Sequence, residues 1–259
     1  MTKRRIIWVL VVVAVLYFGA KEAKGPVVDW YVQHYYGRET AVPAGSAPDQ
    51  VWLTIAADPQ TSVAVQWRTS TDVAEGWVQY RPADTEDAEE LRADTTIVSD
   101  RLLKNDPENH RHAAVLTGLQ PGTTYAYRVG SKAPEHWSDW FEFSTAPATP
   151  EPFSFVYLGD PQRGFEFWGD LLERAQAHAP DAAFYAIAGD LVNDGDMRNE
   201  WDAFFRAGEG VFGRVPAVPA LGNHDYTDRN GAKMYLDLLT LPENGPEDIP
   251  PECAYSFEY

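Results

Sequence analysis

The chain has 259 residues, of which 44% are hydrophobic, enough for about two globular domains with buried cores. Its 39 acidic and 21 basic side chains give a formal net charge of −18, which argues against binding a nucleic-acid polymer through phosphate contacts. The single cysteine, Cys253, excludes a disulfide framework and a thiolate zinc cluster within the chain.

The N-terminus has the pattern of an export signal. Three cations at residues 3–5 precede an uncharged run at residues 6–20, which as a helix is about 22 Å long, short of the roughly 30 Å hydrocarbon core. That length favours a signal peptide, but the poor cleavage sites after Ala20 and Gly25 favour an uncleaved signal anchor. We expect residues 1–25 to anchor an extracytoplasmic protein, periplasmic or at the cell surface, which is secreted if the segment is cleaved.

The segment from residue 48 to residue 147 has an all-β pattern. Short runs of alternating or β-branched and aromatic residues are separated by turn residues at the spacing of a β-sandwich. The predicted strands lie within residues 51–57, 62–70, 76–82, 95–100, 112–119, 123–131 and 139–145. In "LTGLQPGTTYAYRVGS", residues 116–131, Tyr125 follows a Pro-Gly turn, which resembles the tyrosine corner of a fibronectin type III domain. We therefore expect a fibronectin type III-like domain at residues 48–147, after a juxtamembrane linker at residues 26–47.

Several conspicuous side chains of this domain are expected to be structural. We place four aromatic residues in the sandwich core: Trp52, Trp67, Tyr80 and Tyr125. His110 and His112 alternate at the start of a strand, but no carboxylate motif accompanies them. We therefore expect exposed polar positions on an edge strand and not a ligand pair.

A change of fold class follows the proline-rich linker "TAPATPEP" at residues 145–152. Three strands are predicted at residues 153–160, 182–190 and 215–225, and they alternate with helices at residues 165–180, 197–213 and 231–240. This alternation predicts a parallel sheet with helices on its faces, an α/β domain at residues 153–259. In such sheets ligands bind at the carboxyl ends of the strands.

All three predicted strands end in glycine followed by an oxygen-bearing side chain. The sequences are Gly159-Asp160, Gly189-Asp190 and Gly222-Asn223-His224-Asp225. The spacings of 30 residues to Asp190 and a further 33 to Asn223 each fit one crossover, which returns the chain to the same edge of the sheet. Carboxylates brought together there repel one another, and a divalent or trivalent cation makes the arrangement tolerable.

These motifs resemble the metallophosphoesterase (calcineurin-like) superfamily. A fibronectin-like domain followed by "GD", "GDLVNDG" and "GNHD" is similar to its purple acid phosphatase-like branch. The resemblance implies a dinuclear metal centre in which Asp160 ligates the first ion, Asp190 bridges both and Asn223 ligates the second. It also implies that His224 protonates the leaving oxygen or stabilises the transition state while a metal-bound hydroxide attacks phosphorus.

The chain departs from the family pattern at two positions. Gln162 stands where many metallophosphoesterases have a histidine ligand, and Asn193 stands where purple enzymes have a tyrosinate. Each is a candidate oxygen ligand or a neighbour of the ligands. Without tyrosinate the purple colour should be absent, and manganese or magnesium becomes plausible beside iron and zinc, so the identity of the two ions stays open.

The later histidine ligands of the family are missing, because no histidine follows His224. The chain stops at "PECAYSFEY", which resembles the beginning of a strand. We expect a fragment of a longer enzyme, inactive by itself, whose α/β domain is the N-terminal half of the catalytic domain.

Two functions from different classes fit this sequence. The first is a metal-dependent phosphoester hydrolase, an acid phosphatase-like phosphomonoesterase with phosphorylated small molecules as substrates. The second is a catalytically inactive extracytoplasmic binding or adhesion module, which the incomplete histidine set favours. A continuing reading frame that encodes an isolated histidine and Gly-His-x-His would decide for the enzyme.

Overall fold

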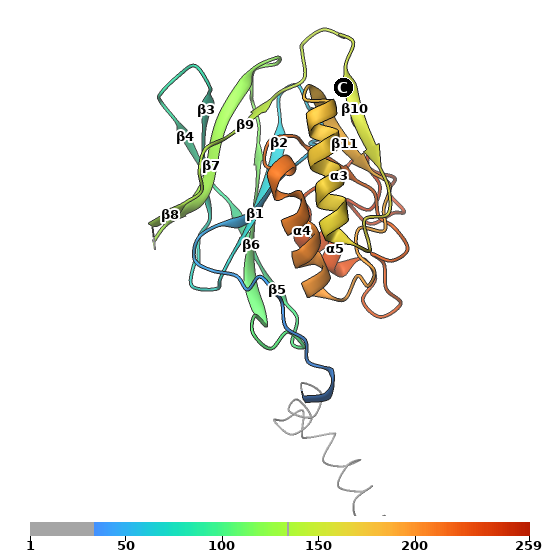
Figure 1. Ribbon diagram of the computed structural model, residues 1–259. Coiled ribbons are helices and arrows are strands. Elements are labelled where there is room, and N and C mark those ends of the chain that lie inside the picture. The colour runs from blue at the N-terminus through green and yellow to red at the C-terminus, as the bar shows by residue number, and fades with distance from the viewer. Residues whose placement is uncertain (1–33, 134) are drawn as a thin grey trace, which may run out of the picture.

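Residues 34–133 and 135–259 are described by a computed structural model, in which a β-sandwich lies against an α/β layer (Figure 1). The sandwich strands are β1 (Asp49–Thr54), β2 (Val63–Thr69), β3 (Trp77–Pro82), β4 (Glu89–Arg92), β5 (Asp94–Ser99), β6 (Glu108–Leu116), β7 (Thr124–Lys132), β8 (Glu135–Trp137) and β9 (Phe141–Ser144). One sheet has the order β4-β3-β7-β8, with β9 also paired to β7, and the other contains β1-β2-β6-β5. The hydroxyl of Tyr125 accepts a 2.9 Å hydrogen bond from the backbone N–H of Gln120, which confirms the predicted tyrosine corner.

The α/β part continues the second sheet of the sandwich. Its strands β10 (Ser154–Leu158), β11 (Ala182–Ile187) and β12 (Ala217–Pro219) are parallel to one another. β12 then pairs in parallel with β1, where Thr54 lies opposite Ala217. A seven-stranded sheet of order β10-β11-β12-β1-β2-β6-β5 therefore runs through both units. The proline-rich segment leads from β9, in the other sheet, to β10 of this seven-stranded sheet. Because both units contribute strands to the seven-stranded sheet, they are not separate bodies on a spacer.

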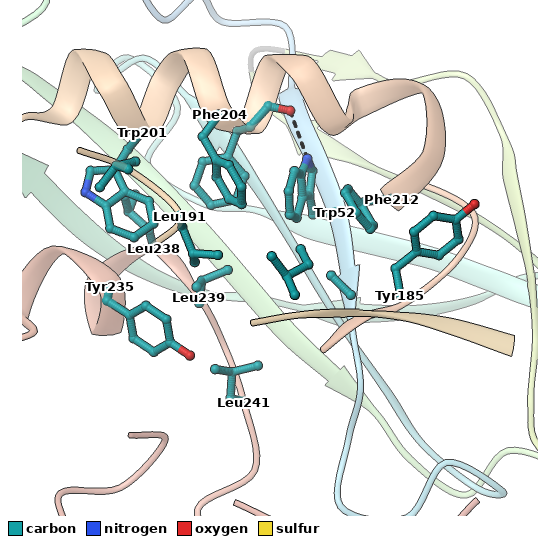
Figure 2. Packing of buried hydrophobic residues seen from close by; sticks show 14 of the residues in the cluster. Trp52, Tyr185, Leu191, Trp201, Phe204, Phe212, Tyr235, Leu238, Leu239 and Leu241 are labelled. Carbon is teal, nitrogen blue, oxygen red and sulfur yellow. Dashed lines mark hydrogen bonds between the residues drawn. The ribbon is translucent and has the colours of Figure 1, made fainter. Parts of the chain in front are cut away.

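Three helices accompany the α/β strands: α3 (Phe165–His178), α4 (Arg198–Phe212) and α5 (Lys233–Leu238). α3 and α4 pack beside each other, and α4 lies against β1 (Figure 1). Trp52 of β1 is fully buried among Phe204, Phe205 and Phe212 of α4, and its indole N–H donates to the carbonyl of Phe205 at 3.0 Å (Figure 2). The expectation that Trp52 fills the sandwich core was wrong, because the shared sheet turns this face of β1 toward α4.

The environment of His110 and His112 on β6 differs from the exposed edge-strand positions that the sequence predicted. β6 lies between β2 and β5, so it is not an edge strand, and His112 is fully buried. The two ring nitrogens of His112 contact the hydroxyls of Thr69 at 2.8 Å and Thr95 at 2.9 Å, and the ring stacks on Trp67. Burial, with smaller contributions from His110 and Arg111, lowers the pKa of His112 to about 4.

The two units are also joined by buried charges. The fully buried guanidinium of Arg68 on β2 bonds Asp202 of α4 at 2.7 Å and Asp49 of β1 at 2.6 Å. Arg198, at the first residue of α4, contacts Asp106 of the sandwich at 3.0 Å. Because buried charges are tolerated only with such partners, these contacts fix where α4 begins and how it lies on the sandwich.

Two predictions fall at the ends of the chain. The predicted strand at residues 251–259 does not form. These residues contact the sheet through side chains instead of pairing with it. The hydroxyl of Tyr255 donates to the carbonyl of Pro219, and the Phe257 ring packs edge-on against Phe184. The predicted signal anchor at residues 1–25 lies outside the described residues. Within residues 34–133 and 135–259 no helix has the length and hydropathy to cross a bilayer.

Candidate metal centre

The strands that carry the predicted ligands end side by side. In the parallel register Leu158 of β10 lies opposite Ile187 of β11, and Ile187 lies opposite Pro219 of β12. The loops that hold Asp160, Asp190 and Asn223 therefore leave the sheet at the same edge, as predicted. Asp190 lies in the loop between β11 and α4, and Asn223 lies in the loop between β12 and α5.

The backbone at the first two predicted ligands has an uncommon conformation. Asp160 has φ = 44° and Asp190 has φ = 50°, both in the left-handed region that residues with a Cβ rarely adopt. Such strain clusters at functional sites, where the surrounding structure holds it in place. The holding contact for Asp190 is a close glycine pair: a Cβ on Gly222 would lie 2.8 Å from the Cα of Asp190, and one on Gly189 would lie 2.9 Å from the Cα of Gly222.

Asp190 is contacted from both neighbouring loops. Its backbone carbonyl accepts the N–H of Gln162 at 3.0 Å, and its carboxylate Oδ1 accepts the backbone N–H of His224 at 2.9 Å. Asp190 thus stands between the first and third motifs. This central place is the one that the predicted bridging ligand requires.

The side-chain oxygen of Gln162 has no hydrogen-bond partner in the described part of the chain. Its Oε1 atom is buried and accepts no hydrogen bond from any group in residues 34–133 and 135–259. A buried carbonyl oxygen left unpaired costs about 1–3 kcal/mol, so the site gains when a cation binds this atom. The described residues contain no cluster of three His, Cys, Asp or Glu side chains that could hold a metal. The candidate donors are two carboxylates, Asp160 and Asp190, and three amides, Gln162, Asn193 and Asn223. This all-oxygen set suits hard ions such as Mg²⁺ or Mn²⁺.

Asn193, the other candidate ligand, has different partners. Its Oδ1 accepts hydrogen bonds from Nε and Nη2 of Arg163, at 3.1 and 3.0 Å. Its backbone N–H donates to the carboxylate of Glu200 at 2.8 Å. The side-chain oxygen therefore already faces a cation, and the tyrosinate position of the purple enzymes carries a polar contact between two loops.

His224 is half-buried and is oriented by the backbone. Its Nδ1 lies 2.7 Å from the carbonyl oxygen of Asn193. A carbonyl can only accept, so Nδ1 carries the hydrogen and Nε2 is the atom that takes up or releases a proton. Nε2 therefore accepts a proton when the ring is neutral and can donate one to substrate only when the ring is doubly protonated.

Asp225 organises the site, although the sequence reasoning assigned it no role. It is buried, its Oδ1 accepts the N–H of Val192 at 3.1 Å, and its Oδ2 accepts the N–H of Gly222 at 2.8 Å. Burial raises the pKa of Asp225 to about 6, against the opposing effect of these N–H donors. The only signal in the sequence was its place at the end of "GNHD".

Comparison with known families agrees with this geometry. Residues 48–145 match the family described as "Purple acid Phosphatase, N-terminal domain", and residues 153–255 match the family described as "Calcineurin-like phosphoesterase". In both of its domains the chain is therefore similar to the purple acid phosphatase-like branch of the metallophosphoesterases. The match order places the sandwich before the phosphoesterase domain, as the motifs predicted.

Three plant proteins are similar to this chain. Purple acid phosphatase 18 of Arabidopsis thaliana is 25% identical over 185 residues, which is 70% of this chain and 38% of the relative. Purple acid phosphatase 22 of the same plant is 31% identical over 114 residues, 44% of this chain and 24% of the relative. A third Arabidopsis relative, "Probable inactive purple acid phosphatase 1", is 26% identical over 163 residues, 56% of this chain and 26% of the relative.

A solved structure shares the fold of this chain. It is a purple acid phosphatase from yellow lupin (Lupinus luteus) seeds, which superimposes with a TM-score of 0.66 at 20% identity and covers 77% of this chain and 42% of that one. The chain spans between about a quarter and two fifths of the length of these relatives.

Proposed function

We propose that this chain forms part of a metal-dependent phosphoester hydrolase whose metal ligands include Asp160, Gln162, Asp190 and Asn223. The observation that carries the proposal is the unpaired, buried Oε1 of Gln162 in the loop whose backbone is bonded to Asp190. The strained backbone of Asp160 and Asp190 supports it. We leave Asn193 out of the ligand set, because its oxygen is bonded to Arg163.

Bound divalent ions supply Lewis-acid stabilisation of the charge that develops on the phosphoryl oxygens. The chain's own part in the reaction is to orient the substrate and to move a proton. With Nδ1–H fixed on the Asn193 carbonyl, His224 delivers a proton from Nε2 to the leaving oxygen when the ring is doubly protonated. The N–H of His224 on the Asp190 carboxylate keeps the imidazole beside the ligand set.

The substrate class and the location of the enzyme are part of the same proposal. We infer phosphorylated small molecules as substrates, because the relatives are phosphatases by name and the charge of −18 disfavours polyanions. We further infer an extracytoplasmic enzyme tethered by residues 1–25, on the strength of the cations and apolar run in that segment.

A catalytically inactive binding module is the second candidate. One specific observation favours it: a relative over 163 residues carries the name of a probable inactive purple acid phosphatase. The incomplete set of metal ligands within the described residues points the same way.

Mutation of two ligands in the full-length protein separates the candidates. Asp190→Ala and Asn223→Ala should each abolish the Mn²⁺-dependent hydrolysis of p-nitrophenyl phosphate, whereas Asp170→Ala, on the exposed face of α3, should leave it unchanged. Normal turnover in the ligand variants would overturn the metal assignment. A full-length wild-type protein that folds but shows no turnover with any divalent ion would favour the inactive module.

A further inference from the structure

Arg163 is exposed at the edge of the candidate metal centre and has no carboxylate partner among the described residues. It follows Gln162 directly in the loop after β10, and its guanidinium donates from Nε and Nη2 to the amide oxygen of Asn193. Acidic residues outnumber basic ones by 39 to 21, yet within residues 34–133 and 135–259 Arg163 forms no ion pair. A neutral amide orients the guanidinium but leaves its positive charge uncompensated.

Asn193 places this cation next to the proposed proton donor. The carbonyl of Asn193 accepts from Nδ1 of His224 at 2.7 Å, while its side chain accepts from Arg163. Its own position is fixed by Glu200, whose carboxylate accepts the N–H groups of Asn193 at 2.8 Å and Asp194 at 3.0 Å. The guanidinium and the imidazole are therefore each one hydrogen bond away from the same rigidly held residue.

The guanidinium has hydrogen-bonding capacity left for a ligand. Arginine carries five N–H donors, and two of them are used on Asn193. The remaining donors lie on a planar group that matches the geometry of phosphate oxygens, and a charged pair of this kind is stronger than a neutral hydrogen bond. The ligand that suits this group at this site is an oxyanion beside His224.

We propose that Arg163 is a substrate-binding residue that contacts the phosphate group and favours phosphomonoesters over phosphodiesters. This inference rests on the proposed phosphoesterase function. A monoester offers three unesterified oxygens and up to two negative charges, whereas a diester offers two such oxygens and one charge. A fixed guanidinium therefore gains more from the monoester. Asn193 has the supporting role of aiming the guanidinium, which explains why an amide stands at this position.

The test compares Arg163→Ala, Arg163→Lys and Asn193→Asp in the full-length protein supplied with Mn²⁺. Arg174→Ala is the matched control, because Arg174 is exposed on α3 nine residues beyond its start. The first measurement is calorimetric binding of inorganic phosphate. The second is the kcat/KM for p-nitrophenyl phosphate and for bis(p-nitrophenyl) phosphate. Manganese content and thermal stability are measured for every variant, because neither should change if Arg163 contacts only the substrate.

Arg163→Ala should weaken phosphate binding and lower kcat/KM for the monoester by about 10- to 100-fold, the range for a lost charge-assisted hydrogen bond. The diester should lose less than about threefold, and Arg163→Lys should fall between wild type and Arg163→Ala. Asn193→Asp should also weaken phosphate binding, because a carboxylate neutralises the guanidinium that it holds. Equal losses for both esters, or unchanged phosphate binding in Arg163→Ala, would overturn the inference while leaving the hydrolase intact. A full-length wild-type protein that neither binds phosphate nor hydrolyses either ester would overturn both.

Discussion

Replacing Gly222 with alanine tests the packing that holds Asp190 in its strained conformation. A Cβ at this position would lie 2.8 Å from the Cα of Asp190 and closer still to its N and Oδ1 atoms. Real Cβ atoms essentially never approach other heavy atoms so closely, so Asp190 must move. The expected cost in the free energy of unfolding is about 1–3 kcal/mol, the range for overpacking. Because Asp190 is the proposed central ligand, Mn²⁺ affinity should also fall about tenfold or more.

Gly210→Ala is the matched control for this substitution. Gly210 lies within α4, and a Cβ there would meet nothing within 4 Å. Alanine should therefore stabilise the protein by about 0.5–1 kcal/mol, since glycine is the poorer helix residue. Urea unfolding measures the stability of both variants, and calorimetric titration measures their Mn²⁺ affinity. If Gly222→Ala matches wild type in stability and Mn²⁺ affinity, the contact between the second and third motifs is not as described.

Three further predictions concern the joined core and its charges. Trp52→Ala should cost about 3–5 kcal/mol in the free energy of unfolding, because the indole is buried against α4. Calorimetry should also show separate unfolding transitions for the two units. A single transition at the wild-type temperature would contradict this. Asp202→Ala should cost about 1–3 kcal/mol, the range for a buried donor left unsatisfied, because Arg68 loses this partner but keeps Asp49; urea unfolding measures the loss. The pKa of His112 is about 4 in the folded state, below its ordinary value of 6.5, so protonation of His112 favours the unfolded state. The neutral imidazole therefore contributes fully to the free energy of unfolding above pH 6.5. This contribution is lost as the pH falls toward 4, by about 3 kcal/mol in total. The stability difference between wild type and His112→Gln should follow this pH dependence, and a pH-independent difference would refute it.

Local patterns predicted most elements because each strand or helix is encoded in its own run of residues. β4 was missed because Glu89, Glu90 and Arg92 give an edge strand the polarity of a loop. The pairing of β12 with β1 joins residues about 160 positions apart, and no local pattern specifies it. The position of Trp52 depends on that pairing, so it was assigned to the wrong core.

The candidate site was predictable as far as strand topology determines it. A glycine and an aspartate follow each of the two strands that end at Leu158 and Ile187. Because parallel strands end at one edge of a sheet, this pattern was enough to place Asp160 and Asp190 at the same edge. The partners of side chains were not predictable. Nothing in the sequence indicates that Arg163 occupies the oxygen of Asn193, since that contact depends on the paths of two loops.

Anomalous scattering from Mn²⁺-soaked crystals of the chain tests the central claim most directly. We expect a manganese peak at the carboxyl ends of β10 and β11, within coordination distance of oxygens from Asp160, Gln162 and Asp190, and we expect this peak to be lost in Asp190→Ala. A peak elsewhere, no peak at saturating Mn²⁺, or a peak that persists unchanged in Asp190→Ala would contradict it.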